Sequence, residues 1–216
     1  MTTERPSGVA ASEARPFDAV LCDVDNVIRF YDTTALARLE REAGLAEGAT
    51  ARVAFTPEVD RPLMLGAVTP ERWAGLVAEA LAGQVTRRTA QELGAALAGA
   101  PFTADEEVVA LLRRARAHVP VILVSNASLE LENDLASLGL DDLAEHAVNS
   151  ARVGVIKPDP RIYGIAVARA GVAAERCLFV DDRRANVEAA VALGMSGVHH
   201  RGAADLRAAL HSLLDG

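Results

Sequence analysis

Short apolar runs separated by helical patterns most constrain the fold of this 216-residue chain. Five runs are expected to be strands, and most are rich in Val, Leu and Ile, as are strands buried on both faces of a parallel sheet. They cover residues 20–22, 120–125, 146–149, 177–180 and 197–199. The segments between them carry apolar residues at helical spacing. Strands therefore alternate with helices, which predicts an α/β fold with a doubly wound parallel sheet.

The alternation is interrupted over residues 33–100, where we expect helices and no strand. Thr69 followed by Pro70 predicts the start of one helix, because Thr caps helices and Pro suits their first turn. Another helix is expected after Thr86, with a possible capping box at Thr89–Glu92. Residues 46–68, which contain two prolines, are expected to be irregular. The block is therefore predicted to be a small helical insert.

These patterns divide the chain into three predicted parts. Residues 1–16 are polar and rich in Ala, Glu and Arg, and we expect them to form a flexible N-terminal tail. The α/β core is expected over residues 17–32 and 101–216, with the helical insert between the two segments. In the second segment, Thr103–Glu106 forms a possible capping box before an apolar helix.

Composition and charge exclude several classes of function. The net charge of −8 argues against nucleic acid or an anionic membrane as the main partner. No apolar run approaches the length of a membrane span, and the first residues lack the apolar centre of a signal peptide. The sequence therefore predicts a cytoplasmic protein, and it does not indicate whether that protein is a monomer or a homodimer.

Other residues that often form sites have simpler interpretations here. Cys22 and Cys177 each lie in a predicted strand, so we expect buried thiols rather than a disulfide or a metal site. The five histidines show no metal-ligand spacing, and His199 and His200 are expected at the surface. Trp73 is expected to pack within the insert.

Polar residues end three of the predicted strands, and these residues carry the functional signal. They are Asp23 with Asp25, Ser125 with Asn126, and Asp181 with Asp182. In a parallel sheet these ends share one edge, where α/β proteins bind ligands. Four carboxylates there would repel one another without a cation, and oxygen ligands favour Mg²⁺. Lys157 lies in a nearby loop and suits a phosphoryl oxygen. The set predicts phosphoryl transfer through a carboxylate nucleophile.

Simpler explanations exist for each acidic pair taken alone. The strand before Asp23 could simply stop at polar residues and enter a turn. Asp181 and Asp182 could be favoured by the positive end of a helix that starts beside them. Their joint presence at the predicted strand ends weighs against both explanations.

Four motifs in this order resemble the haloacid dehalogenase-like (HAD) superfamily, most of whose members are phosphatases. They are Asp23–Val27, the strand ending in Ser125–Asn126, Lys157–Pro158, and Phe179–Asp182 with Asn186 four residues on. The resemblance spans nearly the whole predicted core. It implies a Rossmann-like three-layer α/β/α core and, less specifically, a helical cap formed by residues 33–100.

The resemblance implies a role for each matching position. Asp23 would be the nucleophile that forms an aspartyl-phosphate, and Asp25 would protonate the leaving oxygen and then activate water. Ser125 and the amide of Asn126 would hold phosphoryl oxygens, while Lys157 would neutralise their charge. Such donors stabilise an in-line transition state because they are already oriented.

The same resemblance implies a Mg²⁺ site. Its ligands would be Asp23, the backbone carbonyl of Asp25, and Asp182, which stands four residues before Asn186. Asp181 would be a second acid at the site, in direct or water-mediated contact with the metal. Many relatives have Gly after the second motif acid, whereas this chain has Asn26, which also tolerates unusual turn conformations.

Several activities within the family stay open at this point. The expected substrate is a small phosphorylated metabolite, and a sugar phosphate follows from family analogy alone. A phosphomutase shares all four motifs. A dehalogenase is disfavoured because such enzymes lack the acid at Asp25, and a catalytically idle relative is disfavoured because the nucleophile and metal acids are present. Four residues could line the cap side of the site, but each is expected to be a surface or hinge residue rather than a specificity determinant: Arg29, Phe30, Tyr31 and Arg61.

Overall fold

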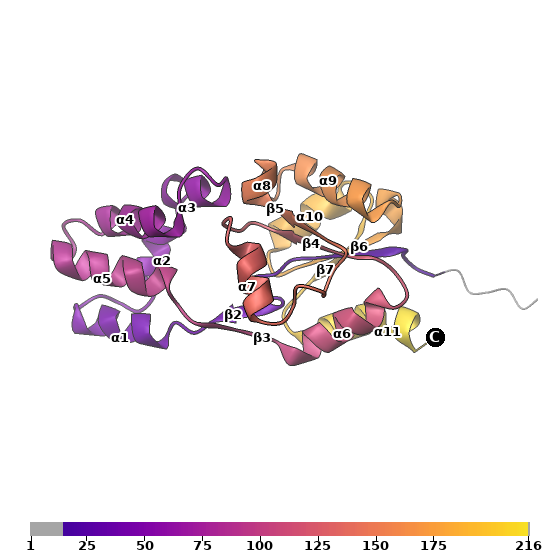
Figure 1. Cartoon of the computed structure of the whole chain (residues 1–216), viewed down its shortest axis with the longest axis horizontal. Coiled ribbons are helices and arrows are strands. Elements are labelled where there is room, and N and C mark those ends of the chain that lie inside the picture. The colour runs from indigo at the N-terminus through magenta and orange to yellow at the C-terminus, as the bar shows by residue number, and fades with distance from the viewer. Residues whose placement is uncertain (1–14, 216) are drawn as a thin grey trace, which may run out of the picture.

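The computed structural model describes residues 15–215 of the chain. These residues form a core built on a parallel sheet and a separate lobe of helices (Figure 1). The predicted tail lies outside the described residues except for Arg15 and Pro16. Within the described part of the chain, no helix is long and apolar enough to cross a membrane.

The core sheet has five strands in the order β5-β4-β1-β6-β7, all paired in parallel. The strands are β1 (Ala19–Cys22), β4 (Val121–Ser125), β5 (His146–Asn149), β6 (Cys177–Asp181) and β7 (Ser196–His199). All five predicted strands are thus confirmed. β1 lies at the centre, so its carboxyl end faces the middle of the sheet edge.

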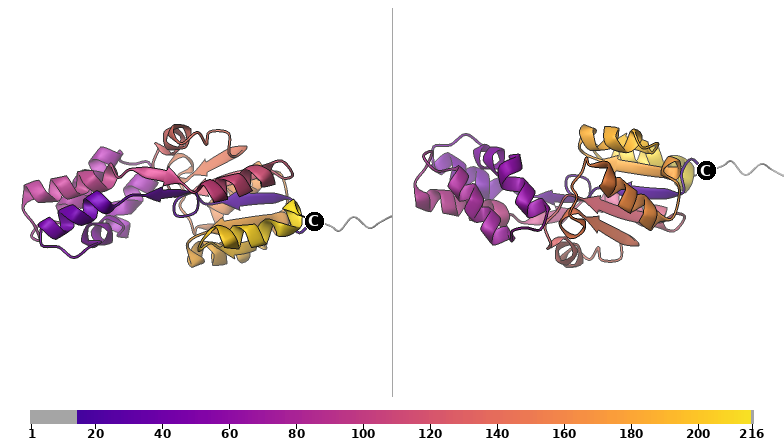
Figure 2. Two further views of the ribbon diagram at one scale, coloured as in Figure 1. Left: turned by 90° about the horizontal axis from the view of Figure 1, so that it is seen from below. Right: turned by 90° about the horizontal axis from the view of Figure 1, so that it is seen from above.

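Helices cover both faces of the sheet, as the two turned views show (Figure 2). Alternate side chains of β1 point to opposite faces. Val20 belongs to a cluster with residues of α6 (Glu106–Arg116), α7 (Leu131–Ser137) and α11 (Ala203–Leu214). Leu21 belongs to the opposite cluster, with residues of α9 (Pro160–Ala170) and α10 (Arg184–Val191). The three-layer α/β/α prediction is confirmed.

The helical lobe, residues 34–98, has its own hydrophobic cluster, which includes Leu36, Trp73 and Leu93. It consists of α1 (Thr34–Glu42), α2 (Ala49–Ala54), α3 (Pro57–Met64), α4 (Pro70–Ala80) and α5 (Arg87–Ala98). The prediction that residues 46–68 are irregular was wrong, because α2 and α3 form there. Pro57 takes the first position of α3, where no N–H is needed, and the second proline comes near the end of the helix.

Two capping predictions were also wrong in detail. The helix expected after Thr86 is α5, but Thr86 rather than Thr89 caps it, and the Thr86 hydroxyl accepts the Thr89 backbone N–H. Asp105 caps α6 by accepting backbone N–H groups, whereas Thr103 lies in a strand. In both cases a second residue that can cap a helix stood near the predicted one.

A short antiparallel ribbon joins the core to the helical lobe. It pairs β2 (Arg29–Tyr31) with β3 (Phe102–Ala104) between the core and the lobe (Figure 1), and in this pairing Arg29 lies opposite Ala104. Three residues are too few to show a strand periodicity, so the sequence did not predict the ribbon. The remaining elements are the short α8 (Ser150–Val153) and the 3-10 turn η1 (Ala174–Arg176).

Candidate active site

Asp23 lies at the carboxyl end of the central strand, in a tight loop that the sequence around it favours. Its backbone N–H donates to the Val180 carbonyl at 2.9 Å, which continues the strand pairing. The Val24 carbonyl accepts N–H bonds from three following residues and so closes the loop. Asn26 adopts φ of 61°, a left-handed conformation that Asn tolerates better than most residues. The loop leaves Asp23 6% exposed, with its carboxylate at the sheet edge.

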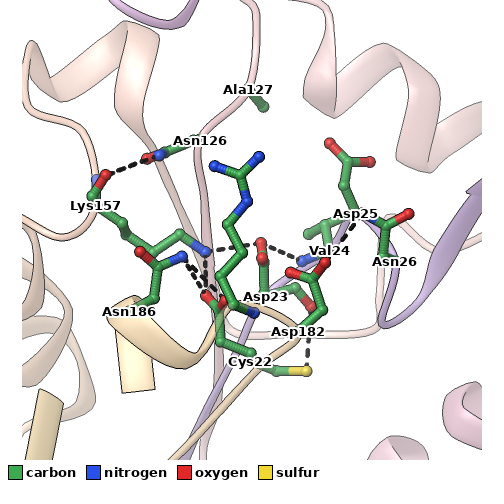
Figure 3. A network of polar contacts seen from close by, with 12 residues as sticks. Cys22, Asp23, Val24, Asp25, Asn26, Asn126, Ala127, Lys157, Asp182 and Asn186 are labelled. Carbon is green, nitrogen blue, oxygen red and sulfur yellow. Dashed lines mark hydrogen bonds and ion pairs between the residues drawn. The ribbon is translucent and has the colours of Figure 1, made fainter. Parts of the chain in front are cut away.

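Lys157 joins two of the predicted site acids. Its Nζ lies 2.8 Å from Asp23 Oδ1 and 2.7 Å from Asp181 Oδ2, and its side chain is 1% exposed (Figure 3). Burial lowers the pKa of Lys157, but the two carboxylates outweigh it and leave that pKa raised. Asn126, directly after β4, holds the backbone of Lys157, because its side chain donates to the Lys157 carbonyl and accepts the Lys157 backbone N–H.

Asp181 and Asp182 follow each other at the end of β6 but have different partners. Asp181 is fully buried and accepts bonds from the Asn186 side chain and the Arg183 backbone N–H. Asp182 is partly exposed and accepts a bond from the Asn26 side chain at 3.1 Å. The helix that starts beyond them therefore orients one acid through Asn186 and leaves the other facing the loop after β1.

The three carboxylates of this cluster outnumber its one lysine, so their charges do not balance without a further cation. Carboxylate oxygens of Asp23, Asp181 and Asp182 lie within 4.8 Å of one another, and Lys157 is the cation paired with two of them. Burial raises the pKa of Asp23 to about 7, although the charge of Lys157 opposes the shift. A bound cation would favour ionised Asp23. All-oxygen donors in this arrangement fit Mg²⁺.

Ser125 has a buried hydroxyl that the protein leaves without a partner. The residue ends β4 and is 1% exposed, and its Oγ makes no hydrogen bond to another protein group. A buried polar atom of this kind usually has a partner. Its place beside β1 makes it available to a ligand oxygen, and Asn126 follows it at the same sheet edge.

Asp25 is the predicted site residue that does not join the cluster. Its carboxylate stands apart from the Asp23–Lys157 pair (Figure 3) and is held instead by the Arg29 guanidinium, at 2.7 Å and 3.1 Å. Arg29, expected to be a surface or hinge residue, is 2% exposed and so not at the surface, but it does lie in β2 of the ribbon that joins the core to the helical lobe. The available signal was its position four residues after an acid and inside a short apolar stretch.

His200 also differs from its surface prediction. It is 4% exposed, and its backbone N–H donates to the Asp181 carbonyl beyond the end of β7. Burial lowers the pKa of His200, which favours the neutral ring. His199 is partly buried and its Nε2 lies 2.9 Å from the Asp182 carbonyl. Both histidines therefore support the segment that carries the two acids.

Comparisons with known proteins identify the family and the fold of this chain. A model of the haloacid dehalogenase-like hydrolases matches residues 17–194. A phosphatase of Mycobacterium tuberculosis, MT3486, is 35% identical over 102 residues, which cover 44% of this chain and 45% of that relative. The chain thus matches less than half the length of this curated relative.

Solved structures show the same fold. A HAD family enzyme of Bacteroides thetaiotaomicron, in complex with magnesium and inorganic phosphate, is 18% identical with a TM-score of 0.64, over 84% of this chain and 92% of that one. A HAD family hydrolase of Deinococcus radiodurans, with bound phosphate and sodium, is 26% identical with a TM-score of 0.62, over 92% and 97%. An L-2-haloacid dehalogenase of Xanthobacter autotrophicus is 18% identical with a TM-score of 0.58, over 84% and 76%. The chain belongs to the haloacid dehalogenase-like hydrolases.

Proposed function

We propose that this hydrolase is a Mg²⁺-dependent phosphatase that acts on a small phosphorylated metabolite through an aspartyl-phosphate on Asp23. The observation that carries the proposal is that Asp23, Lys157 and two further carboxylates converge at one edge of the sheet. They lie beside the buried Ser125 hydroxyl, which has no partner among the described residues. The set offers a nucleophile, a cation site and phosphoryl-oxygen donors together.

In the first step, a carboxylate oxygen of Asp23 attacks the phosphorus atom and the bond to the ester oxygen breaks. Asp25 gives its proton to that oxygen, so the product leaves as an alcohol. The Ser125 hydroxyl and the Asn126 backbone amide donate to the phosphoryl oxygens, and Lys157 offsets the negative charge of those oxygens. These donors are fixed by the sheet edge before the substrate arrives.

In the second step, water attacks the phosphorus atom of the aspartyl-phosphate. Asp25 accepts the proton of the water, the bond to Asp23 breaks, and inorganic phosphate leaves. Asp23, Asp181, Asp182 and the Asp25 carbonyl are the proposed Mg²⁺ ligands. When bound, Mg²⁺ would offset the negative charge of the carboxylates and of the phosphoryl group.

The helical lobe is proposed to be the cap of this site. It is tied to the core by the β2–β3 ribbon and by a hydrogen bond from the Ser150 hydroxyl to the Met64 carbonyl. Closing over Asp23 would exclude bulk water and select the leaving group. A sugar phosphate is the first substrate to test. The phosphatase of M. tuberculosis supports this class of reaction, and the acid at Asp25 argues against dehalogenation.

The test compares p-nitrophenyl phosphate hydrolysis by the wild type and Asp23→Asn, each with Mg²⁺ and with a chelator. We expect turnover that requires Mg²⁺ and falls at least about a thousandfold in Asp23→Asn. Asp142→Asn is the matched control, because that carboxylate is 69% exposed and should leave activity unchanged. Turnover that survives in Asp23→Asn, or dechlorination of 2-chloropropionate without phosphatase activity, would contradict the proposal.

A further inference from the structure

The Arg29 side chain makes three hydrogen bonds to two carboxylates, one in the loop after β1 and one on α7. Its Nε lies 2.7 Å from Asp25 Oδ1 and its Nη2 lies 3.1 Å from Asp25 Oδ2, a bidentate pair. Its Nη1 lies 2.6 Å from Asp134 Oδ2 on α7. Arginine makes such a fork because its donors lie in one rigid plane. The Asp25 carboxyl is therefore held in one orientation from one side.

The pairing leaves the acid accessible while the arginine is buried. The Arg29 side chain is 3% exposed, whereas the side chains of Asp25 and Asp134 are 30% and 27% exposed. Burial lowers the pKa of Arg29, but the Asp25 hydrogen bonds and charge outweigh it and leave that pKa raised. Asp25 thus keeps an open edge towards solvent while its inner edge is fixed by a permanent cation.

Two aromatic rings hold the arginine in place. The Arg29 guanidinium lies 5.1 Å from the centre of the Tyr31 ring and 5.3 Å from that of Phe102, within the range of cation–π attraction. The two rings meet edge to face at 5.6 Å. Tyr31 belongs to β2 and Phe102 to β3, the two strands that join the lobe to the core. The contact between Asp25 and Arg29 therefore lies at the base of this ribbon.

We infer that Arg29 is a positioning residue for Asp25. Arg29 fixes the Asp25 carboxyl that serves the leaving oxygen, and it links that carboxyl to the β2–β3 ribbon. This inference rests on the proposed function and adds a residue to it. The role needs the bidentate fork as well as the charge. Without the fork, Asp25 samples several rotamers and spends less time where it can transfer a proton.

Leaving-group dependence separates positioning from a general structural effect. p-Nitrophenolate leaves without a proton, whereas phenolate is the stronger base and needs one from Asp25. In Arg29→Met we expect kcat/KM for phenyl phosphate to fall at least about tenfold more than kcat/KM for p-nitrophenyl phosphate. Arg29→Lys, which keeps the charge but loses the fork, should show the same selective loss. If Arg29→Met does not fold, Arg29→Lys carries the test.

Arg176→Met is the matched control. Arg176 makes an equivalent bidentate pair with Asp18, at 2.8 Å and 2.9 Å, before the start of β1 and so at the other end of the strand. The Arg176→Met variant should leave unchanged the ratio of kcat/KM for phenyl phosphate to kcat/KM for p-nitrophenyl phosphate. Equal losses for both substrates in Arg29→Met, or an unchanged ratio in folded Arg29→Lys, would overturn the inference. The wild type and Asp23→Asn report separately on the proposed function, since they test chemistry without altering Arg29.

Discussion

Among the residues that the structure describes, the buried side chains of Lys157 and Arg29 are paired with carboxylates, whereas one oxygen of the partly buried Asp60 has no partner. Lys157 has two carboxylate partners, and so does Arg29. Pairing is expected because a buried charge without a partner costs several kcal/mol. Asp60 of α3 differs, since its buried Oδ1 has no hydrogen-bond partner. Burial raises the pKa of Asp60 to about 6, and the charge of Arg183 only partly opposes the shift.

Asp60→Asn is expected to stabilise the protein above about pH 6 and to have little effect near pH 4. The raised pKa means that the folded state binds a proton more tightly than the unfolded chain, so wild-type stability falls as pH rises from about 4 to 6. Partial exposure limits the expected gain to about 1 kcal/mol at pH 7. Urea unfolding of the wild type and of Asp60→Asn at pH 4 and at pH 7 measures this difference in the free energy of unfolding. A difference that is the same at both values would refute the explanation.

The backbones of α4 and α5 in the helical lobe lie close together at Gly94 of α5. A Cβ atom placed on Gly94 of α5 would lie 2.4 Å from the Ala74 carbonyl oxygen of α4. Glycine is otherwise unfavourable inside a helix, by about 1 kcal/mol relative to alanine. Glycine is nevertheless favoured at position 94, because the absence of a side chain allows the two helix backbones to come into contact.

We expect Gly94→Ala to destabilise the protein by about 1–3 kcal/mol, because backbone blocks the new methyl group. Gly164→Ala is the matched comparison within α9, where a Cβ would meet no atom within 4 Å. That change should instead stabilise by up to about 1 kcal/mol, through helix propensity alone. Denaturation followed by circular dichroism compares the two variants. Similar effects with the same sign would show that the close approach is not rigid.

The whole molecule consists of a core and a lobe whose hydrophobic clusters are separate. The proposed metal ligands all lie in the core. Trp73, the single tryptophan, lies in the lobe and is 5% exposed. Unfolding of the lobe can therefore be followed separately by fluorescence, and unfolding of the whole by circular dichroism.

We expect Mg²⁺ at ten times its dissociation constant to stabilise the core by about 1.4 kcal/mol, because the proposed ligand cluster exists only in the folded state. The transition seen by circular dichroism should shift more than the transition seen by Trp73 fluorescence. In Asp182→Asn the shift should be much smaller. Coincident transitions that move together would instead show that the two parts unfold as one cooperative unit.

The positions of the strands along the chain and the identity of the clustered acids could be predicted from the sequence, since both depend on local patterns. Runs such as residues 120–125 are apolar along their length, and a parallel sheet brings their ends to one edge. Asp23, Lys157, Asp181 and Asp182 therefore meet as expected, although their catalytic and metal-binding roles stay predictions.

The tertiary structure alone decided features whose partners are distant in the chain. Arg29 is buried only because Asp134 and Phe102, more than seventy residues away, enclose its guanidinium together with nearby Asp25. His200 is buried because its neighbours come from other elements, and β2 becomes a strand only when β3 lies beside it. Local periodicity is set by neighbouring residues, whereas burial and ion pairing depend on which segments the fold brings together.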